Sequence, residues 1–555
     1  MVTDDAQDTG DNAQAAAPAV RQPPRSSLTG PAPRALAAAA AGLCQLLSLP
    51  PYGLWWLGPV GAALLTLAVM GARARRAAWL GAVCGAALMV PLLRWQDVLG
   101  TDVWLLIAAA EAVYFAPMAA GLALVVRLPG WPVWTAALWV LQEAVRARFP
   151  LGGFPWGKLA FAQPDTPFTG YAAAGSSPLT TFAVALVGAL LLAAALRLAR
   201  RPRRARRAPA AAGLLAGAVA LTGAGAVLPA ATAPAVDHTA TVALVQGNVP
   251  GVGQMSVLGE RMEVLGNHVD GVHRLAERVE AGEAPRPDLV VLPENASDID
   301  AYADPAAADM IDAAARDIGA PLLFGITRYS ADGTEREVRS VVWEPGAGPV
   351  DHYTKRYLVP FGEYVPYRDF FTRFVERLDQ VGSDAVPGTE PGALDMGGTA
   401  LATAICFDVA FDRPVREAVA AGGQIIAVPT NNANYNFTGQ SDQQLAITRL
   451  RAVEHGRPAV VASTSGISAV VTAGGRIDYR SPEAEPAVHV AEIPAMTGQT
   501  PATRLGALPE AALCALALGA LAAAAGRGLR RARAEPARGG RSGGAGGADP
   551  PEAAQ

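Results

Sequence analysis

Long apolar segments with almost no charged side chains constrain the fold of this chain more than any other feature of its sequence. A helix that crosses the hydrocarbon core of a bilayer needs about 20 predominantly apolar residues. A soluble helix bundle would need polar faces, which these segments lack. The sequence therefore predicts a membrane domain of about seven spans at residues 34–230 and a further span at 506–526. The first two segments are short and fit either two tilted spans or one re-entrant pair. The segments are 34–49, 54–70, 77–94, 103–126, 131–146, 177–196, 209–230 and 506–526.

The deficit of charge is confined to these segments. Charged residues make up 17% of the 555-residue chain, whereas soluble domains average about 25%. Residues 241–500, in contrast, have the composition of an ordinary globular domain. Residues 1–33 are polar and rich in Ala, Pro and Asp, and residues 527–555 are rich in Gly, Ala and Arg. Such compositions predict disordered tails.

Arginines between the apolar segments predict the orientation. If all the segments span, every arginine cluster falls on one side of the membrane, which the positive-inside rule makes the cytoplasm. Both tails are then cytoplasmic, and residues 241–500 follow an odd number of spans and face outward. The net charge of −4 gives no reason to expect a nucleic-acid partner. The clusters are Arg21, Arg25 and Arg34; Arg73, Arg75 and Arg76; Arg127; Arg197 to Arg207; and Arg527 to Arg533.

A few charged residues break this pattern. Glu111 and Glu143 lie within apolar segments, where charges are costly and often functional. Glu143 and Arg146 share a helical face at i,i+3 spacing and could form an ion pair, with a structural clamp as the alternative to a functional role. Arg148 and Lys158 fall with Arg146 on the predicted outer side, where such charges are structural or bind lipid phosphate.

Residues 241–500 alternate short apolar runs with amphipathic ones, which predicts a layered α/β domain. No GxGxxG or P-loop motif follows any of its strands, so the sequence gives no sign of a dinucleotide or nucleoside triphosphate. The predicted strands are 241–246, 288–292, 321–326, 400–406, 424–429 and 459–463, and the predicted helices are 256–281, 303–318, 412–421 and 440–455.

Three polar residues of this domain stand at or near strand ends, where α/β folds place their sites. They are Glu294, Lys355 and Cys406. Together they make an acyl-transfer site: the carboxylate takes the thiol proton, the thiolate attacks a carbonyl, and the ammonium, with a backbone N–H, holds the oxyanion. Taken singly, Glu294 also fits a turn carboxylate and Lys355 a surface lysine.

Cys406 is the one cysteine of the chain outside the apolar segments. It has no disulfide partner there and no CxxC spacing that would suggest zinc, so no metal is predicted. A buried, inert thiol is the alternative interpretation. Cys44, Cys84 and Cys514 lie in apolar segments, where cysteine usually acts as a small hydrophobic residue.

The segments around these residues resemble the nitrilase superfamily and, within it, the apolipoprotein N-acyltransferase family. The resemblance covers residues 35–525, and the block that begins at Lys355 is specific to this family. The matching blocks are Val245-Gln-Gly-Asn248, Leu292-Pro-Glu294, Lys355-Arg-Tyr-Leu-Val-Pro-Phe-Gly-Glu363-Tyr-Val-Pro366, Ile405-Cys406-Phe-Asp408, Pro429-Thr-Asn-Asn432, Arg449 to Pro458, Thr464 to Ser468 and Gly153-Phe-Pro-Trp156.

The resemblance implies a multi-span α-helical membrane domain with an αββα nitrilase-like domain on the outer face of the bacterial cytoplasmic (inner) membrane. It implies a Glu294–Lys355–Cys406 triad that works without a cofactor. Cys406 would carry an acyl chain, as a thioester, from a phospholipid to the α-amino group of a diacylglyceryl-cysteine lipoprotein. Glu363 would steady Lys355 and the leaving group, and Phe407 would supply the oxyanion-hole N–H.

Two segments depart from the family pattern. Asn431-Asn-Ala-Asn-Tyr-Asn436 lacks the tryptophan that the family often has there, with Tyr435 or Phe437 as the candidates to replace it. Val338-Arg-Ser-Val-Val342 stands where the family often has Tyr-Asn-Ser-Ala. Neither change touches the triad.

Two other functions compete with acyl transfer. A membrane-tethered amidase or nitrilase would use the same triad on water, but an amide substrate in solution would need no multi-span platform. A transporter or scaffold with a decayed outer domain predicts the loss of a triad residue, and all three are present.

Overall fold

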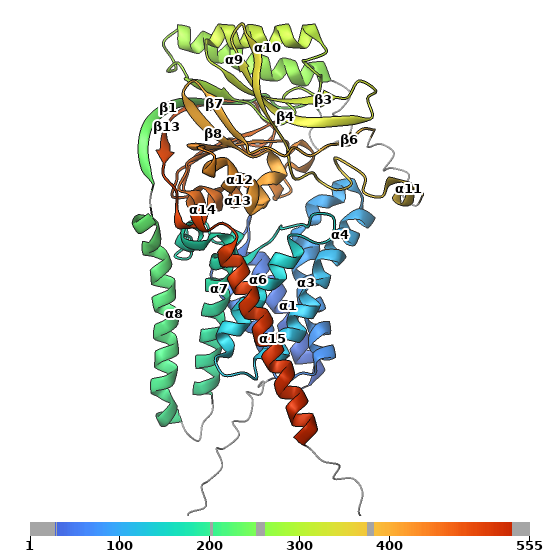
Figure 1. The fold of residues 1–555 in the computed structure, drawn as a ribbon, viewed down its shortest axis with the longest axis vertical. Coiled ribbons are helices and arrows are strands. Elements are labelled where there is room, and N and C mark those ends of the chain that lie inside the picture. Colours follow the sequence, from blue (N-terminus) through green and yellow to red (C-terminus); the bar gives the residue numbers. More distant parts are fainter. Residues whose placement is uncertain are drawn as a thin grey trace, which may run out of the picture.

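The computed structural model describes residues 28, 30–199, 204–232, 234–250, 261–373 and 382–534. A bundle of long helices forms one end of the molecule, and a domain built on two sheets forms the other (Figure 1). The chain enters this α/β domain through β1 (Ala235–Gln246) and leaves it after β13 (Ala487–Thr497). The domain is therefore inserted ahead of the last bundle helix.

Each predicted apolar segment contains a helix. Among the described residues, four helical stretches are long and apolar enough to cross a membrane: Thr101–Val125, Gly170–Leu198, Ala208–Leu228 and Leu508–Gly528. The bundle helices are α1 (Pro31–Ser48), α2 (Leu57–Val69), α3 (Ala74–Leu92), α4 (Thr101–Val113), α5 (Phe115–Val125), α6 (Trp131–Arg146), α7 (Gly170–Leu198), α8 (Arg204–Thr232) and α15 (Leu508–Ala534).

The structure corrects several predicted boundaries: α7 begins at Gly170 and not at 177, β1 begins at Ala235 and not at 241, the segment 103–126 is divided into α4 and α5, and both tails are shorter than predicted. α1 begins at Pro31, inside the predicted tail 1–33, because proline suits the first turn of a helix. α15 continues to Ala534, past its predicted end at 526, through Ala and Arg residues that are good helix formers. Residues 1–27 and 535–555 of the predicted tails, and 256–260 of the predicted helix 256–281, lie outside the described residues.

Small residues let the bundle helices approach closely. A Cβ atom added at Gly81 of α3 would lie 2.2 Å from the carbonyl oxygen of Phe115 in α5. One added at Gly188 of α7 would lie 2.2 Å from the carbonyl oxygen of Pro59 in α2. Such backbone-to-backbone contact is typical of helices that associate in lipid, where apolar side chains gain nothing by leaving the solvent.

The α/β domain contains two sheets. The strand order is β13-β1-β2-β3-β4-β5 in the first sheet, with β6 paired to β4, and β12-β11-β10-β9-β8-β7 in the second. In each sheet three central strands are parallel, β1 to β3 and β8 to β10. The remaining strands are β2 (Leu289–Val291), β3 (Leu322–Tyr329), β4 (Glu335–Glu344), β5 (Gly348–Thr354), β6 (Asp384–Ala385), β7 (Ala393–Met396), β8 (Thr399–Thr403), β9 (Ile425–Thr430), β10 (Ala459–Ser463), β11 (Ala469–Val471) and β12 (Ile477–Arg480).

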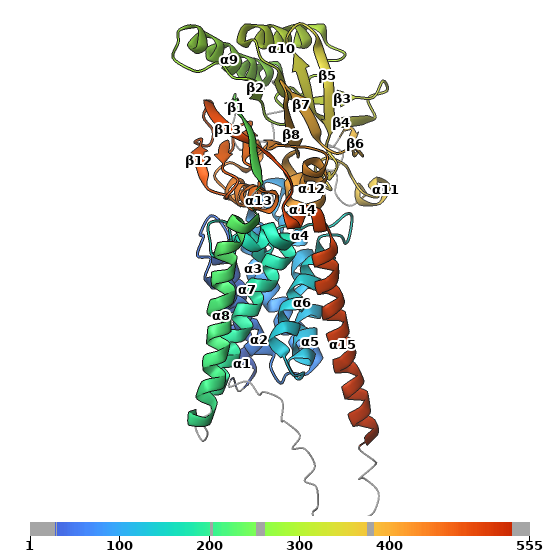
Figure 2. The same ribbon diagram turned by 60° about the vertical axis from the view of Figure 1, so that its left-hand side comes forward.

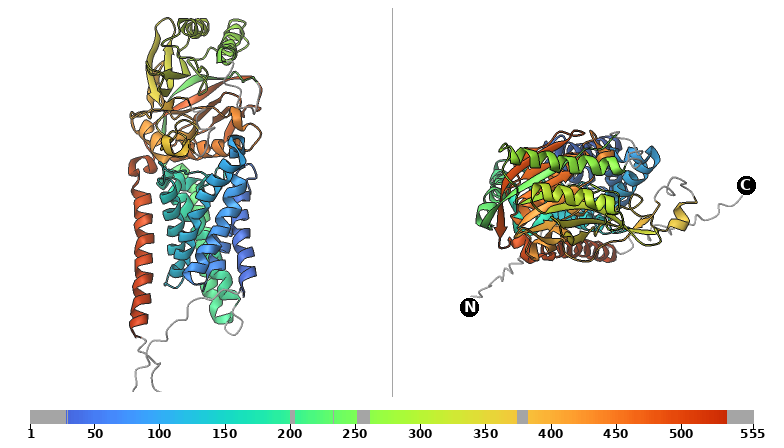
Figure 3. Two further views of the ribbon diagram at one scale, coloured as in Figure 1. Left: turned by 90° about the vertical axis from the view of Figure 1, so that its right-hand side faces the viewer. Right: turned by 90° about the horizontal axis from the view of Figure 1, so that it is seen from above.

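Helices cover the outer face of each sheet, so the domain has the predicted αββα layers. α9 (Arg261–Glu280) and α10 (Pro305–Ile318) pack on the first sheet, at the end farthest from the bundle (Figures 1 and 3). α12 (Asp412–Ala420) and α13 (Gln440–His455) pack on the second. A third core, which includes Val242 and Ile425, lies between the sheets.

The layer of α12 and α13 rests on the bundle (Figure 2). One continuous apolar core joins them: it includes Trp156 and Phe161 from the loop after α6, and Phe407 and Leu450 from the α/β domain. The two parts therefore share buried surface instead of being joined only by linkers.

Candidate active site

The structure brings the three predicted site residues together at one edge of the α/β domain. Glu294 follows β2, Lys355 follows β5, and Cys406 begins the short 3-10 turn η6 (Cys406–Ala410) after β8. β2 and β5 belong to one sheet and β8 to the other. The site therefore lies where strand ends of both sheets meet.

Lys355 is the centre of this site. Its side chain is almost fully buried, and its ammonium donates to Glu294 Oε1 at 2.8 Å and to Glu363 Oε1 at 2.7 Å. The backbone N–H of Val359 donates to Glu363 Oε2 at 2.7 Å, and that of Asn431 to Glu294 Oε2 at 2.9 Å. Both carboxylates are thus held by the backbone as well as by the lysine.

The electrostatics of the site keep the thiol protonated at rest. Burial and the neighbouring Glu294 carboxylate raise the pKa of the Cys406 thiol to about 12, against the opposing effect of Lys355. Burial also raises the pKa of Glu294, although Lys355 opposes it, which makes Glu294 a stronger base. Burial alone would lower the pKa of Lys355, but Glu294 and Glu363 raise it well above its usual range. The lysine therefore stays a cation.

Cys406 occupies a strained turn that other side chains hold in place. Its φ of +49° lies in the left-handed region, which costs energy for a residue other than glycine. Behind it, the buried carboxylate of Asp408 accepts from the N–H of Ile405 at 3.2 Å, from the N–H of Tyr357 at 2.7 Å and from the Tyr353 hydroxyl at 2.8 Å. Asp408 thereby fastens the Cys406 turn to the segment that carries Lys355.

The bundle also contributes to the site, which sequence reasoning missed. The rings of Phe154 and Trp156, in the loop after α6, stack on Phe407 at centroid distances of 5.6 and 6.2 Å. Phe407 is the residue whose N–H was predicted to hold the oxyanion. The Gly153-Phe-Pro-Trp156 block, noted in the sequence only as a family match, was the available signal.

A second aromatic contact connects the bundle to the segment that lacks the family tryptophan. Trp95, after α3, lies 5.1 Å from Tyr435 and 5.5 Å from Trp156 between ring centroids. Phe437, the other candidate replacement, is 74% exposed. Tyr435 therefore fills the space beside the site, and Phe437 does not.

The predicted ion pair between Glu143 and Arg146 is wrong. Arg146 instead donates to Glu111 Oε2 at 3.0 Å and to the carbonyl of Trp156 at 2.6 Å. Glu143 accepts from the N–H of Leu159 at 2.8 Å and from the Thr181 hydroxyl at 2.7 Å. Helical spacing correctly placed Glu143 and Arg146 on one face of α6. Their hydrogen bonds, however, go to residues of α4, of α7 and of the loop after α6.

Comparisons with known proteins match both parts of the chain. Two family models match: the apolipoprotein N-acyltransferase N-terminal domain at residues 41–190, and carbon-nitrogen hydrolase at residues 241–502. An apolipoprotein N-acyltransferase of Mycolicibacterium smegmatis is 39% identical over 86% of this chain and 82% of that protein. One of Azotobacter vinelandii is 31% identical over 88% of this chain and 94% of that protein. Among solved structures, an amidase from Nesterenkonia sp. is 23% identical with a TM-score of 0.35, over 47% of this chain and 93% of that chain.

Proposed function

The chain belongs to the apolipoprotein N-acyltransferase family, and from that premise we propose that it moves a fatty acyl chain from a membrane phospholipid to the N-terminal amino group of a diacylglyceryl-cysteine lipoprotein. The observation that carries this proposal is the position of the site: Cys406, Lys355 and Glu294 lie together, and aromatic side chains of the membrane bundle stack on the residue after Cys406. A lipid donor and a lipid-anchored acceptor both reach a site of that kind.

The first half-reaction forms a thioester. Glu294 takes the thiol proton as the sulfur of Cys406 attacks the ester carbonyl of the phospholipid. Lys355 and the N–H of Phe407 stabilise the oxyanion of the tetrahedral intermediate. When this intermediate collapses, the C–O bond breaks and the proton on Glu294 passes to the departing lysophospholipid oxygen.

The second half-reaction uses the same groups in reverse. The neutral α-amine of the lipoprotein attacks the thioester carbonyl, and Glu294 takes a proton from the nitrogen. The C–S bond breaks, the amide is released, and the thiolate of Cys406 regains its proton from Glu294. Because the acyl chain stays on Cys406 after the lysophospholipid has left, the two substrates occupy the site in turn.

Water must be kept from the thioester between the halves, because hydrolysis would waste the acyl chain. The apolar core shared by the bundle and the α/β domain supports this requirement.

The deciding experiment incubates the purified full-length protein with phospholipid alone and searches Cys406 for an acyl adduct by mass spectrometry. A stable adduct that a lipoprotein peptide discharges as N-acyl product supports transfer; rapid release of free fatty acid instead would assign a hydrolase.

Glu363 is expected to be important but less so than Lys355. Glu363→Gln removes a charge from Lys355 while keeping an oxygen that can accept its hydrogen bond. A hydrogen bond to a charged group is worth about 1.5–3 kcal/mol, so we expect acylation of Cys406 to slow by about tenfold to a hundredfold. Single-turnover acylation without acceptor measures this. A loss as large as that of Glu294→Gln would mean that Glu363 is itself the base.

The orientation gives a separate prediction. We propose that the protein lies in the bacterial inner membrane with the α/β domain outside and both ends of the chain in the cytoplasm, as the arginine clusters favour. Alkaline phosphatase inserted at the turn near residue 330 should be active, and a green fluorescent protein there should be dark. A fusion after residue 534 should give the reverse pair of results. Phosphatase that is inactive at 330 would refute the count of seven spans before the domain.

A further inference from the structure

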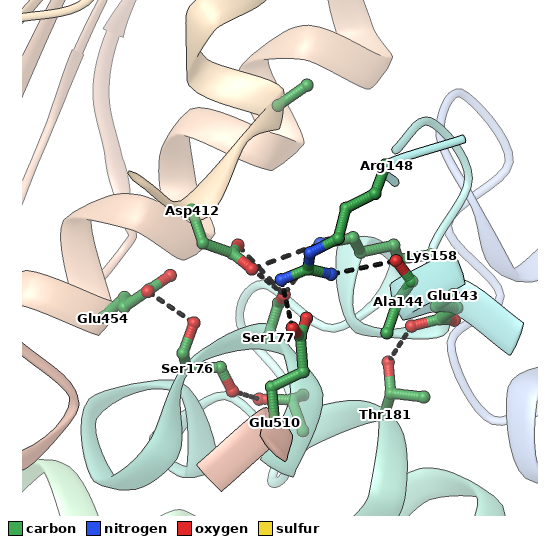
Figure 4. Close-up of polar contacts among 12 residues, drawn as sticks. Glu143, Ala144, Arg148, Lys158, Ser176, Ser177, Thr181, Asp412, Glu454 and Glu510 are labelled. Atoms are coloured by element: carbon green, nitrogen blue, oxygen red, sulfur yellow. Dashed lines mark hydrogen bonds and ion pairs between the residues drawn. The ribbon is translucent and has the colours of Figure 1, made fainter. Parts of the chain in front are cut away.

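A largely buried cluster of charged and hydroxyl side chains crosses the junction between the bundle and the α/β domain, with Asp412 its half-buried member (Figure 4). Through Arg451 it contacts the turn that begins at Cys406, and the reaction described above uses none of its members. From the bundle come Lys158, Ser176 and Ser177, and from the α/β domain come Asp412, Arg451 and Glu454.

The bundle supplies its hydroxyls through a break in α7. Gly175 and Ser176 depart from helical geometry, Ser176 with a φ of +65°, and Pro178 follows at the start of the next helical turn. Proline fits a helix start but not a helix interior, so the run Gly-Ser-Ser-Pro interrupts the helix at this place. The break directs both serine hydroxyls to partners in the α/β domain: Ser176 donates to Glu454 Oε1 at 2.6 Å.

Asp412 joins the two parts. Its carboxylate lies 3.4 Å from the ammonium of Lys158 and 2.5 Å from the guanidinium of Arg451. The Ser177 hydroxyl donates to Asp412 Oδ1 at 3.1 Å and accepts from Lys158 at 3.2 Å. Lys158 and Arg451 hold the pKa of Asp412 well below its usual range despite burial, so it is an anion at any pH near neutral.

Arg451 links Asp412 to the Cys406 turn. Its side chain is fully buried, and it donates to the carbonyl of Val409 at 3.0 Å and to that of Ala410 at 3.3 Å. Both carbonyls belong to η6, the turn that begins at Cys406. It also pairs with Glu454, which accepts from Ser176. Asp408 therefore holds the strained turn from the Lys355 side, and Arg451 holds it from the bundle side.

We propose that Asp412 is a positioning residue for Cys406: it fixes Arg451 against the nucleophile turn and, through Lys158 and Ser177, ties that turn to the membrane bundle. Without the Asp412 carboxylate, the buried cations Lys158 and Arg451 both lose an anionic partner, and Glu454 is the remaining acidic member of the cluster. This loss favours displacement of Lys158 or Arg451. A misplacement of about 1 Å at a reacting group can cost about a hundredfold in rate. The inference rests on the proposed function for its rate measurement, but not for the position of the thiol.

The test uses the full-length protein in lipid and the isosteric change Asp412→Asn. We expect the single-turnover rate of Cys406 acylation, per folded molecule, to fall by about tenfold to a hundredfold. The phospholipid concentration at half-saturation should change less than about threefold, since the proposed reaction uses no member of the cluster. Adding Lys158→Met to Asp412→Asn should recover part of the rate, because it removes an unpaired buried charge. A purely structural role would lower the amount of folded protein and leave the rate per molecule unchanged.

The matched control is Glu510→Gln. Glu510 pairs with Arg148 at the same junction (Figure 4), but neither residue bonds to η6, so the rate should stay near that of the wild type.

If Asp412→Asn does not fold, Lys158→Gln tests the same connection from the bundle and should slow acylation by at least about threefold. Alkylation of Cys406 by iodoacetamide, followed by mass spectrometry, needs no lipid and should change at least about threefold in rate. This second readout separates the inference from the proposed function, because it stands even if phospholipid fails to acylate the wild-type protein. Normal acylation and alkylation in Asp412→Asn, or a slower rate matched by an equal rise in half-saturation, would overturn the inference.

Discussion

Cys406→Ala is expected to abolish acyl transfer, and Cys406→Ser to leave none that can be measured. Without the thiol there is no thioester, and the remaining groups of the site have nothing to activate. Loss of the nucleophile in enzymes of this chemical type costs up to about a millionfold in rate. The measurement is transfer of a labelled acyl chain from phospholipid to a lipoprotein peptide by the purified protein in detergent or lipid.

The other three cysteines provide the controls for this experiment. Cys44, Cys84 and Cys514 are free thiols in bundle helices, and each replaced by alanine should leave transfer near the wild-type rate. Transfer by Cys406→Ala at a rate near the wild type would remove the thioester mechanism altogether. Loss of transfer in one of the bundle variants, with normal folding, would point to a second functional thiol.

Lys355→Met and Glu294→Gln should each block formation of the thioester itself. Loss of one oxyanion donor typically costs about 3–4 kcal/mol, or roughly a hundredfold to a thousandfold in rate. The loss in Lys355→Met should lie at the upper end, because the buried Glu294 and the half-buried Glu363 would then be two carboxylates without a cation between them. Glu294→Gln keeps the shape of the side chain but removes the carboxylate that takes the thiol proton, while burial still raises the pKa of the Cys406 thiol.

Stopped assays with phospholipid and no acceptor measure this step in isolation, since they count acylated Cys406 alone. If Glu294→Gln acylates Cys406 at the normal rate, Glu294 is not the base and Glu363 would have to take that role. If Lys355→Met acylates normally, the oxyanion is held by backbone N–H groups alone. Both variants should be compared at equal amounts of folded protein.

The sequence was sufficient for the features that depend on local pattern. Apolar runs predicted helix in every bundle segment, although the run 103–126 forms two helices, α4 and α5, and short apolar runs predicted the parallel strands near the middle of each sheet, including β10 at Ala459–Ser463. These strands are buried on both faces, which gives them continuous apolar sequences. The edge strands β5 and β12 escaped prediction because they are largely exposed or half-buried and mix polar with apolar residues.

Contacts between residues far apart in the chain could not be predicted from the sequence pattern. Spacing placed Glu143 and Arg146 on one helical face, but it could not show that Arg146 turns to Glu111 and to the loop after α6. Lys158 stood out only as a charge on the predicted outer side. Its partner Asp412 is more than two hundred residues away in the chain, where nothing in the sequence connects the two.

The apolar core that continues from the bundle into the layer of α12 and α13 includes the face of the α/β domain that packs on the bundle. An α/β domain separated from the bundle would expose this apolar face to water, together with the side of the Cys406 turn that Arg451 contacts. The α/β domain therefore needs the membrane bundle to bury this face. Its chemistry is confined to a two-dimensional surface, on which an anchored donor and an anchored acceptor meet it by lateral diffusion and not from bulk solution.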